Sequence, residues 1–298
     1  MKIVGNDIDF LRDDDRYRQW RNNKLRFYPQ SIDEIRVPID GLLDLKPEQK
    51  AGIKKACMRS NMAIYRCRDL SADRSAVIAF AAQFGLTRLD HHLCANDDGV
   101  SELSVASAGI RSDYVPYSNR SLSWHTDGYY NDSEHQIRAV ILHCVQSAVS
   151  GGENALIDPE LAYIRLRDEN PGFIAAFEHP ACMTIPANTG TGGEIRPELS
   201  GPVFSYGVHG EIHMRYSARK INIRWRDDPL TTAARVFLSE MLNDSDGPVL
   251  RCRLQAGEGL ISNNVLHDRT AFSDGQDQQR LLYRARFFDR IEIQGTSE

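Results

Sequence analysis

A histidine and an aspartate separated by one residue, His125 and Asp127, are the side chains of this 298-residue chain best suited to binding a metal ion. Side chains two positions apart on an extended strand point to the same side, so an imidazole and a carboxylate converge there. A third ligand must come from elsewhere, and His267, preceded by the glycine-punctuated apolar run 257–261, is the best candidate. Two imidazoles and one carboxylate form a facial triad with open positions, which is typical of non-haem Fe(II) oxygenases.

The sequence context favours a metal site over a chance pair. A lone His-X-Asp is weak evidence in a chain with nine histidines, and a structural zinc site would close its ligand shell. Trp124 before the pair and Tyr129-Tyr130 after it indicate a strand that ends at an aromatic-lined cavity.

Three arginines near the C-terminus indicate a site for anions. Arg280, Arg284 and Arg286 are spaced by even numbers, so they share one face of the strand expected at 281–288. A buried charge without a partner loses its hydration, and a dicarboxylate is the most economical partner. The alternative is an ion-pair network with the acids of the chain, which we expect for Arg286.

Several other residues are candidates for substrate binding. Arg215, with Arg219 just beyond, either binds a carboxylate or sulfonate in a bidentate way or is surface charge. His91 and His92 are adjacent and point in different directions, so they do not share a metal; one faces substrate, or both are loop histidines bonded to backbone. Four aromatic residues offer a cage for a quaternary ammonium instead: Tyr117, Trp124, Tyr129 and Tyr130.

The remaining pattern is that of a mainly β protein with helical insertions, an α+β fold. Helices are expected at 47–59, 71–84, 158–167 and 230–242, with a short one from 171. Strands are expected at 62–67, 103–108, 122–125, 137–145, 202–206, 212–216, 249–254, 260–263 and 281–288, with another from 155. Many short strands with turn signals favour a two-sheet jelly roll. The segment 187–193 has the composition of a mobile loop.

The bulk composition sets limits on domains and partners. Residues 1–45 are polar and arginine-rich, which predicts an extension packed on the core or on a partner subunit, and 46–298 form one domain. A net charge of −5 argues against nucleic acid as a partner. There is no apolar run of membrane-spanning length and no Cys-X-X-Cys pair. We expect a cytoplasmic protein that binds a small molecule. The chain could also form a homo-oligomer.

Taken together, the motifs resemble a known family. They are Trp-His-Thr-Asp-Gly at 124–128, Gly-Gly-Glu-Asn at 151–154, Asn-Asn-X-X-His-Asp-Arg at 263–269, and an arginine thirteen positions after His267 (280 − 267 = 13). The combination is similar to the Fe(II)/2-oxoglutarate-dependent dioxygenases of the taurine dioxygenase and γ-butyrobetaine hydroxylase superfamily, over roughly residues 60 to 290. The resemblance implies a double-stranded β-helix fold.

The resemblance also implies a role for each matched residue. His125, Asp127 and His267 match the iron ligands. Arg280 matches the residue that binds the distal carboxylate of 2-oxoglutarate, and Asn154 stands where relatives often have a threonine touching the same carboxylate. Arg284 matches a site for an anionic substrate group, and the stretch that contains His91 and His92 resembles a region that supplies another substrate contact.

The implied reaction uses Fe(II), 2-oxoglutarate and O2 to hydroxylate an unactivated C–H bond, with succinate and CO2 as co-products. We expect the substrate to be a small polar metabolite that carries a carboxylate, such as an amino acid, a betaine or a sulfonate analogue. Tyr129 is a further candidate substrate contact. The alternative is a cupin-type metal-dependent hydrolase or isomerase without a 2-oxoglutarate requirement.

Overall fold

The computed structural model describes residues 13–92, 94–190 and 193–293. Its α-helices are α2 (Asp14–Phe27), α3 (Pro47–Ser60), α4 (Arg74–Ala82), α5 (Pro159–Glu169), α6 (Pro171–Phe177) and α7 (Pro229–Asn243). The first strands are β1 (Arg36–Ile39), β2 (Met62–Cys67), β3 (Ser101–Leu103), β4 (Leu122–His125), β5 (Ala139–Gln146), β6 (Ser150–Gly151) and β7 (Asn154–Ile157). Short strands follow at β8 (Met183–Ile185), β9 (Asn188–Gly190), β10 (Gly193–Arg196), β11 (Leu199–Gly201), β12 (Phe204–Tyr206), β13 (Ile212–Met214) and β14 (Arg224–Trp225). The last are β15 (Leu250–Cys252), β16 (Glu258–Ser262), β17 (Leu266–Arg269), β18 (Phe272–Ser273) and β19 (Leu281–Phe287).

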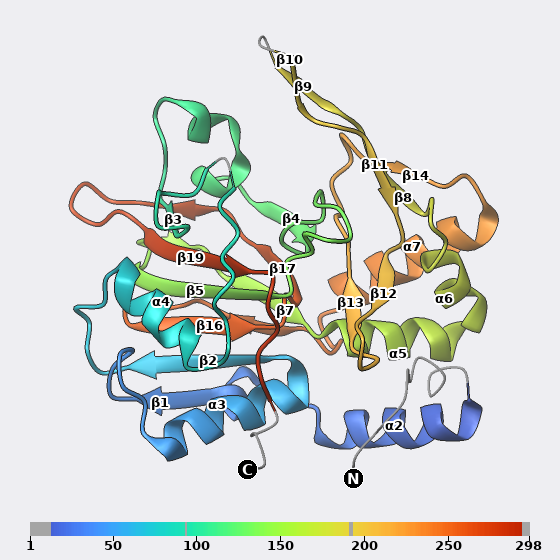
Figure 1. Cartoon of the computed structure of the whole chain (residues 1–298), viewed down its shortest axis with the longest axis horizontal. Coiled ribbons are helices and arrows are strands. Elements are labelled where there is room, and N and C mark those ends of the chain that lie inside the picture. Colours follow the sequence, from blue (N-terminus) through green and yellow to red (C-terminus); the bar gives the residue numbers. More distant parts are fainter. Residues whose placement is uncertain (1–12, 93, 191–192, 294–298) are drawn as a thin grey trace.

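Two main sheets form the scaffold (Figure 1). The larger has the strand order β1-β2-β16-β5-β19-β3, and the smaller has the order β15-β7-β17-β4. All pairings within them are antiparallel except that of β1 with β2. The predicted mainly β fold with helical insertions is confirmed, and its sheets are open rather than closed into a barrel.

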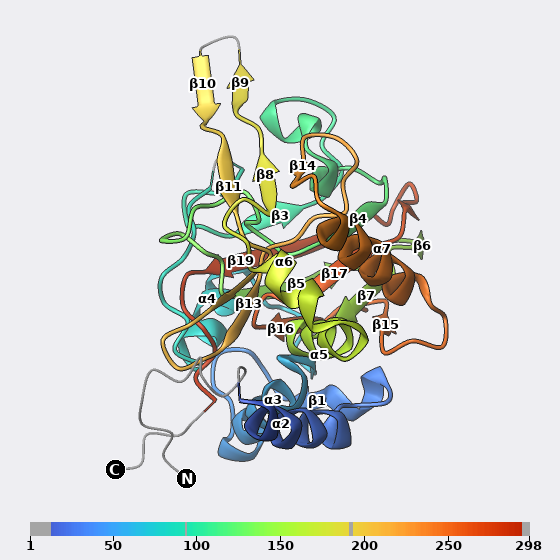
Figure 2. The same cartoon turned by 90° about the vertical axis from the view of Figure 1, so that its right-hand side faces the viewer.

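The helices divide between two hydrophobic cores. Helices α3 and α4 pack on the larger sheet, whose core is centred on buried residues such as Ile64, Phe80 and Ile141. Helices α5, α6 and α7 pack on one another on the other side of the molecule (Figure 2). Their core joins Phe177 and Leu238 to Leu266 of β17 in the smaller sheet. The metal-ligand candidates lie on β17 and at the end of β4, within the smaller sheet.

Some sequence-based expectations need correction. The polar segment before residue 45 contains a helix, α2, and a strand of the larger sheet, β1, rather than only an extension; residues 1–12 lie outside the described part. Helix α4 begins at Arg74 and is capped by Asp73, not by Ser71. Strand β3 covers 101–103 rather than 103–108. The segment expected to be a loop at 187–193 contains strand residues of the hairpin β9–β10, with 191 and 192 outside the described residues.

The structure bears on two other expectations. The six cysteines are buried and free, as expected from the lack of a Cys-X-X-Cys pair, and they pack as small apolar residues. Among the described residues, no helix has both the length and the apolar character needed to cross a membrane.

Gly259 on β16 shows why the apolar run before the second histidine contains glycine. A Cβ atom at this position would lie 2.2 Å from the ring of Tyr65 and 2.6 Å from the carbonyl oxygen of Leu142. The Tyr65 ring extends from β2 over β16, and its hydroxyl lies 3.1 Å from Nδ1 of the buried His143 on β5. Glycine therefore lets β16 lie between β2 and β5 while a tyrosine occupies the space over it.

We expect Gly259→Ala to lower the free energy of unfolding by about 1–3 kcal/mol, because the added methyl group overpacks the sheet. Gly41→Ala is the matched control, since nothing lies within 4 Å of the Cβ position there; it should change stability by less than about 1 kcal/mol. Chemical denaturation measures both. Equal stabilities for the two variants would contradict the packing account.

Candidate metal centre

The two predicted histidine ligands face each other across adjacent strands. β17 pairs with β4 in antiparallel register, with His267 directly opposite His125, and the ring centroids are 4.3 Å apart. The register shifts between His267 and Arg269, an irregularity of the kind that re-aims side chains beside active sites. Residues 142 positions apart in sequence (267 − 125 = 142) are thus brought together by one strand pairing.

The same local hydrogen bond orients both imidazoles. Nδ1 of His125 lies 2.8 Å from the carbonyl oxygen of Ser123, and Nδ1 of His267 lies 2.9 Å from that of Val265. Since a carbonyl only accepts, each Nδ1 carries the proton and each Nε2 keeps a lone pair. Burial, and then the neighbouring His267, lower the pKa of His125 to about 3, so its ring is neutral, the form that binds metals.

Asp127 is a buried carboxylate with one occupied and one free oxygen. Its Oδ1 lies 3.1 Å from a guanidinium nitrogen of Arg284 and 3.9 Å from one of Arg286. Burial opposes ionisation, but these arginines hold the pKa of Asp127 below its usual range. Its Oδ2 is buried and has no hydrogen-bond partner in the described residues. A buried carboxylate oxygen without a partner is costly, so a cation fits there.

The donor set fits Fe(II), although the three side chains are not yet arranged in a coordination geometry. Two neutral imidazoles and one carboxylate are the ligands that a facial triad requires. In the described part of the chain, no three His, Cys, Asp or Glu side chains are placed so that they could already hold a metal ion. Binding a metal through all three side chains therefore requires them to adjust.

A second feature beside the histidines is a pair of buried arginines around one ring. The guanidinium carbons of Arg280 and Arg269 lie 4.9 and 4.8 Å from the ring centroid of Phe272. Burial lowers the pKa of Arg280, and burial followed by Arg280 lowers that of Arg269 to about 9. One terminal nitrogen of Arg280 and Nε of Arg269 are buried without a hydrogen-bond partner among the described residues. Arg269 donates to the carbonyls of Ser118 and Arg120, but neither guanidinium forms an ion pair with an acid of the described residues, so the two buried charges favour an anion.

Arg280 and Asn154 line the same small cavity, as expected from their predicted common role. Asn154 begins β7 directly opposite Arg269 of β17. The turn before it requires glycine, because a Cβ atom at Gly151, where φ is +69°, would lie 2.1 Å from the carbonyl oxygen of Ala271. Gly152 also lines the cavity.

The other two arginines of β19 belong to a buried ion-pair network. Arg284 is paired with Asp127, as described above, and its Nε has no hydrogen-bond partner among the described residues. Arg286 forms an ion pair with Asp90 and donates a hydrogen bond of 2.8 Å to the hydroxyl of Tyr130. The expectation that Arg286 belongs to an ion-pair network is confirmed.

Arg215 is neither a surface charge nor placed to bind substrate. It is 6% exposed, and its guanidinium donates to four backbone carbonyls, those of Tyr129, Met183, Leu199 and Gly201. Burial lowers its pKa to about 10. Because its donors are used by backbone carbonyls, Arg215 links the loop after Asp127 to strands β8 and β11 and has a structural role.

The remaining substrate candidates lie at different depths. The Tyr129 ring is 6.5 Å from the His125 ring, edge to face, and its hydroxyl lies 3.4 Å from a nitrogen of Arg219. His92 is partly buried; its Nδ1 accepts from the amide of Cys94, so its Nε2 donates to Ser101 Oγ at 2.9 Å. Burial, then Arg286 and Arg284, lower the pKa of His92 to about 2. His91 is exposed.

The four aromatic residues do not form a cage. Trp124 packs in the core of the smaller sheet, whereas Tyr117 packs in the core of the larger sheet. Tyr117 also donates a hydrogen bond to the carbonyl of Cys94. Of the four, Tyr129 and Tyr130 are partly buried beside the histidine ligands, with ring centroids 5.3 Å apart.

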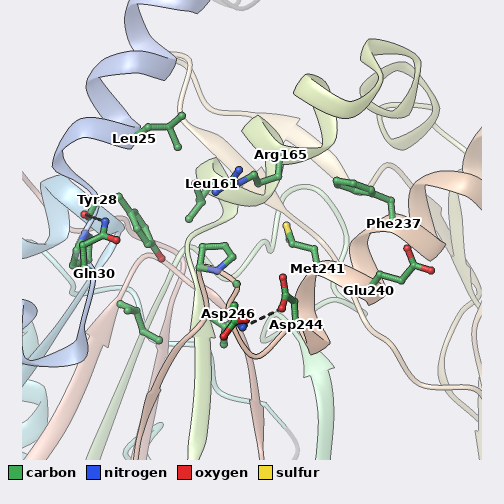
Figure 3. Close-up of a pocket in the computed structure, with 15 residues that line it drawn as sticks. Leu25, Tyr28, Gln30, Leu161, Arg165, Phe237, Glu240, Met241, Asp244 and Asp246 are labelled. Carbon is green, nitrogen blue, oxygen red and sulfur yellow. Dashed lines mark hydrogen bonds between the residues drawn. The ribbon is translucent and has the colours of Figure 1, made fainter.

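A separate cavity lies away from this centre. It has a volume of about 740 Å³ and lies between α2, α5 and α7, where Leu25, Leu161 and Phe237 project from the three helices (Figure 3). None of the residues predicted for the site is among the described residues that line it. Its position gives it no part in the metal chemistry.

A sequence model of the taurine catabolism dioxygenase TauD, TfdA family matches residues 24–286. The chain belongs to this family. It is therefore a non-haem iron dioxygenase that uses Fe(II), 2-oxoglutarate and O2, and the predicted enzyme class is confirmed. The alternative of a cupin-type hydrolase or isomerase receives no support from the comparison.

Individual relatives agree with the family assignment. A uridine-5'-phosphate dioxygenase of a Streptomyces species is 29% identical over 220 residues, which cover 70% of this chain and 77% of that protein. An asparagine oxygenase structure is 15% identical, with a TM-score of 0.57 and coverage of 87% of this chain and 94% of that one. A taurine dioxygenase structure from Burkholderia xenovorans is 20% identical, with a TM-score of 0.57 and coverage of 87% and 88%. The structures show a shared fold.

Three residues at the centre were not singled out from the sequence. Arg269 shares the Phe272 ring with Arg280, Asp90 neutralises Arg286, and Asn264 binds the backbone of Asp127. Arg269 and Asn264 both lie within the Asn-Asn-X-X-His-Asp-Arg motif, so the motif carried a usable signal for them. Asp90 had none, because its partner is 196 positions away (286 − 90 = 196).

We expect Arg284→Gln to destabilise the metal-free protein by about 3 kcal/mol, because it leaves the buried Asp127 carboxylate without its main partner. A bound divalent cation should recover part of this loss, since it supplies the missing positive charge. Thermal unfolding with and without metal measures both effects.

Arg219→Gln is the control, because Arg219 is exposed and its side chain hydrogen-bonds to the Tyr129 hydroxyl rather than to a buried acid. It should change stability by less than about 0.5 kcal/mol. If Arg284→Gln is equally mild, the ion pair is not what stabilises Asp127.

Proposed function

We propose that His125, Asp127 and His267 bind the Fe(II) of this dioxygenase. The observation that carries the proposal is the pairing of His125 with His267 next to a buried Asp127 oxygen that has no partner. Both Nε2 atoms are available because both Nδ1 atoms donate to backbone carbonyls. Arg284 occupies Oδ1 of Asp127, which leaves Oδ2 as the free donor of the carboxylate.

We further propose that Arg280 and Asn154 hold the distal carboxylate of 2-oxoglutarate. They line one cavity, and the buried Arg280 has a free donor nitrogen. Arg269, on the other side of the Phe272 ring, adds positive charge that favours a dianion. When bound, iron would activate O2, the oxidant, of which one oxygen atom enters succinate as 2-oxoglutarate loses CO2 and the other hydroxylates a substrate C–H bond.

For the substrate, we propose a small metabolite that carries a carboxylate. Arg284 lies directly beside the proposed metal ligand and has an unpartnered Nε, so an anionic group bound there brings its neighbouring carbons close to the metal. Tyr129 lies beside His125, Arg219 contacts the Tyr129 hydroxyl, and Arg284 acts electrostatically on His92, so these three side chains offer further polar contacts. Solved relatives with this fold are described in complex with hydroxyasparagine and with hydroxyarginine.

A phosphate-bearing nucleotide is the second candidate substrate. The observation that favours it is the 29% identity to a protein named uridine-5'-phosphate dioxygenase. Arginine also binds phosphate in a bidentate way, so Arg284 suits either anion.

Succinate formation under saturating Fe(II), 2-oxoglutarate and O2 distinguishes the two. Amino acids and betaines form one panel, and uridine 5'-phosphate with its nucleoside forms the other. A carboxylate substrate should stimulate turnover, and the first proposal fails if only the nucleotide does so.

We expect Arg280→Ala to raise the KM for 2-oxoglutarate by about 100-fold, because it removes a buried charged partner of the carboxylate. Steady-state kinetics with varied 2-oxoglutarate measure this. Arg251→Ala is the control, since Arg251 is exposed on β15, the strand next to β7. An unchanged KM in Arg280→Ala would remove Arg280 from the cosubstrate site.

A further inference from the structure

A buried lysine links helix α2 to the rest of the molecule. The ammonium of Lys24 lies 2.6 Å from a carboxylate oxygen of Asp158 and 2.6 Å from one of Glu160. Its side chain is 6% exposed and that of Asp158 is 0% exposed. Although burial opposes charge, the two carboxylates hold the pKa of Lys24 above its ordinary value. Lys24 is therefore the counter-ion of a carboxylate that would otherwise be buried alone.

Asp158 hydrogen-bonds to Asn61, which in turn hydrogen-bonds to Asn263. Oδ1 of Asp158 caps α5 by accepting from the amide of Glu160, and it also accepts from the side chain of Asn61 at 2.9 Å. Asn61 ends α3 in the left-handed conformation, with φ +56°. Its own Oδ1 accepts from the side chain of Asn263 at 2.9 Å, and its backbone carbonyl accepts from the Asn263 amide at 2.8 Å.

The next residue of the loop holds the proposed aspartate ligand. Asn264 is 2% exposed and has φ +51°. Its Oδ1 accepts from the amide of Asp127 at 2.8 Å, and its Nδ2 donates to the carbonyls of Asp127 at 2.9 Å and Ile137 at 2.6 Å. Three residues later the same segment contributes His267. The loop between β16 and β17 thus connects both ligands to the buried contacts of Asn61.

These contacts are separate from the general docking of α2 on α5. Docking also uses Arg21, whose Nε lies 2.8 Å from Asp168, and Tyr17, whose hydroxyl lies 3.2 Å from the same carboxylate. Within the described residues, neither side chain forms a hydrogen bond or ion pair with Asp158, Asn61 or Asn263. The family match begins at Lys24, so most of α2 precedes it.

We propose that Lys24 is a positioning residue of the iron site, acting through Asp158, Asn61 and Asn263 on the loop that orients Asp127 and His267. The series of contacts from Lys24 to Asn264 is called the relay below. Groups bonded directly to metal ligands typically change metal affinity 10- to 100-fold when they are lost, and Lys24, which acts through several contacts, is expected at the low end of that range. The inference rests on the proposed role of Asp127 as an iron ligand.

The test compares Lys24→Met, Asn263→Ala and the control Arg21→Met. Lys24→Met keeps most of the side-chain volume but removes the charge, Asn263→Ala breaks the relay without leaving an uncompensated charge, and Arg21→Met weakens only the docking of α2. Fe(II) is titrated anaerobically against a competing chelator. Hydrogen exchange of the metal-free protein is followed over residues 123–130 and, as a reference, over helix α7.

The relay predicts that Lys24→Met and Asn263→Ala each weaken Fe(II) binding about 10-fold. In both, exchange over 123–130 should be faster while α7 stays as in the unmodified chain. Arg21→Met should remain within about twofold on both measurements. If Lys24→Met does not fold, Lys24→Gln, which retains a donor toward Asp158, takes its place and should show a smaller effect in the same direction.

Two results overturn the proposal. One is that a folded relay variant retains the Fe(II) affinity and the 123–130 protection of the unmodified chain. The other is that Arg21→Met matches the relay variants, which makes α2 docking in general responsible. Asp127→Ala tests the iron site alone: undiminished Fe(II) binding there defeats the proposed ligand set, whereas the exchange measurement on metal-free protein still decides the relay.

Discussion

The structure depends above all on the antiparallel pairing of β4 with β17. This pairing places His125 opposite His267 and lets the backbone two residues before each histidine fix its tautomer. Asp127 then follows β4 directly, where the side chain of Asn264 binds its amide and carbonyl. The proposed ligands are therefore positioned by the backbone geometry of this strand pair and of the turn that follows β4, and β17 is held on its other side by β7.

The second constraint is electrostatic. Arg269, Arg280 and Arg284 are buried within one region, and the carboxylate that pairs with one of them is a proposed metal ligand. In the described part of the chain, the arginine pair around Phe272 forms no ion pair with an acid, whereas Arg284 and Arg286 of β19 are paired with Asp127 and Asp90. The site thus has two regions. Around Phe272 the positive charge requires an added anion, whereas around Asp127 the arginine charges are already neutralised by acids in the metal-free chain. That division fits a dicarboxylate cosubstrate in the first region and a substrate anion that competes for Arg284 in the second.

Much of this arrangement was predictable, because the signals are local. The motifs and the family resemblance pointed to His125, Asp127, His267, Arg280 and Asn154, and the turn at Gly151 is legible from its glycines. The expected strand alternation does not apply to Asp127, which lies in the turn after β4. Long-range polar contacts were not predictable. Arg215 was read as a ligand or surface group, but its environment is made of carbonyls from three separate segments. Helix α2 was missed, although its inward residues Tyr17, Trp20 and Leu25 have the spacing of one helical face, and the buried contact of Lys24 with Asp158 adds to their packing. Nothing within the segment 13–27 reveals a partner 134 positions away (158 − 24 = 134).

The most direct measurement of the central claim is the visible absorption of the protein with Fe(II) and 2-oxoglutarate in the absence of O2. A keto acid that chelates iron through its keto oxygen and adjacent carboxylate gives a charge-transfer band, and His267→Ala removes one proposed ligand. The account predicts the band in the unmodified chain and its loss in His267→Ala. A band of the same intensity in both proteins, or none in the unmodified chain with iron bound, would contradict it.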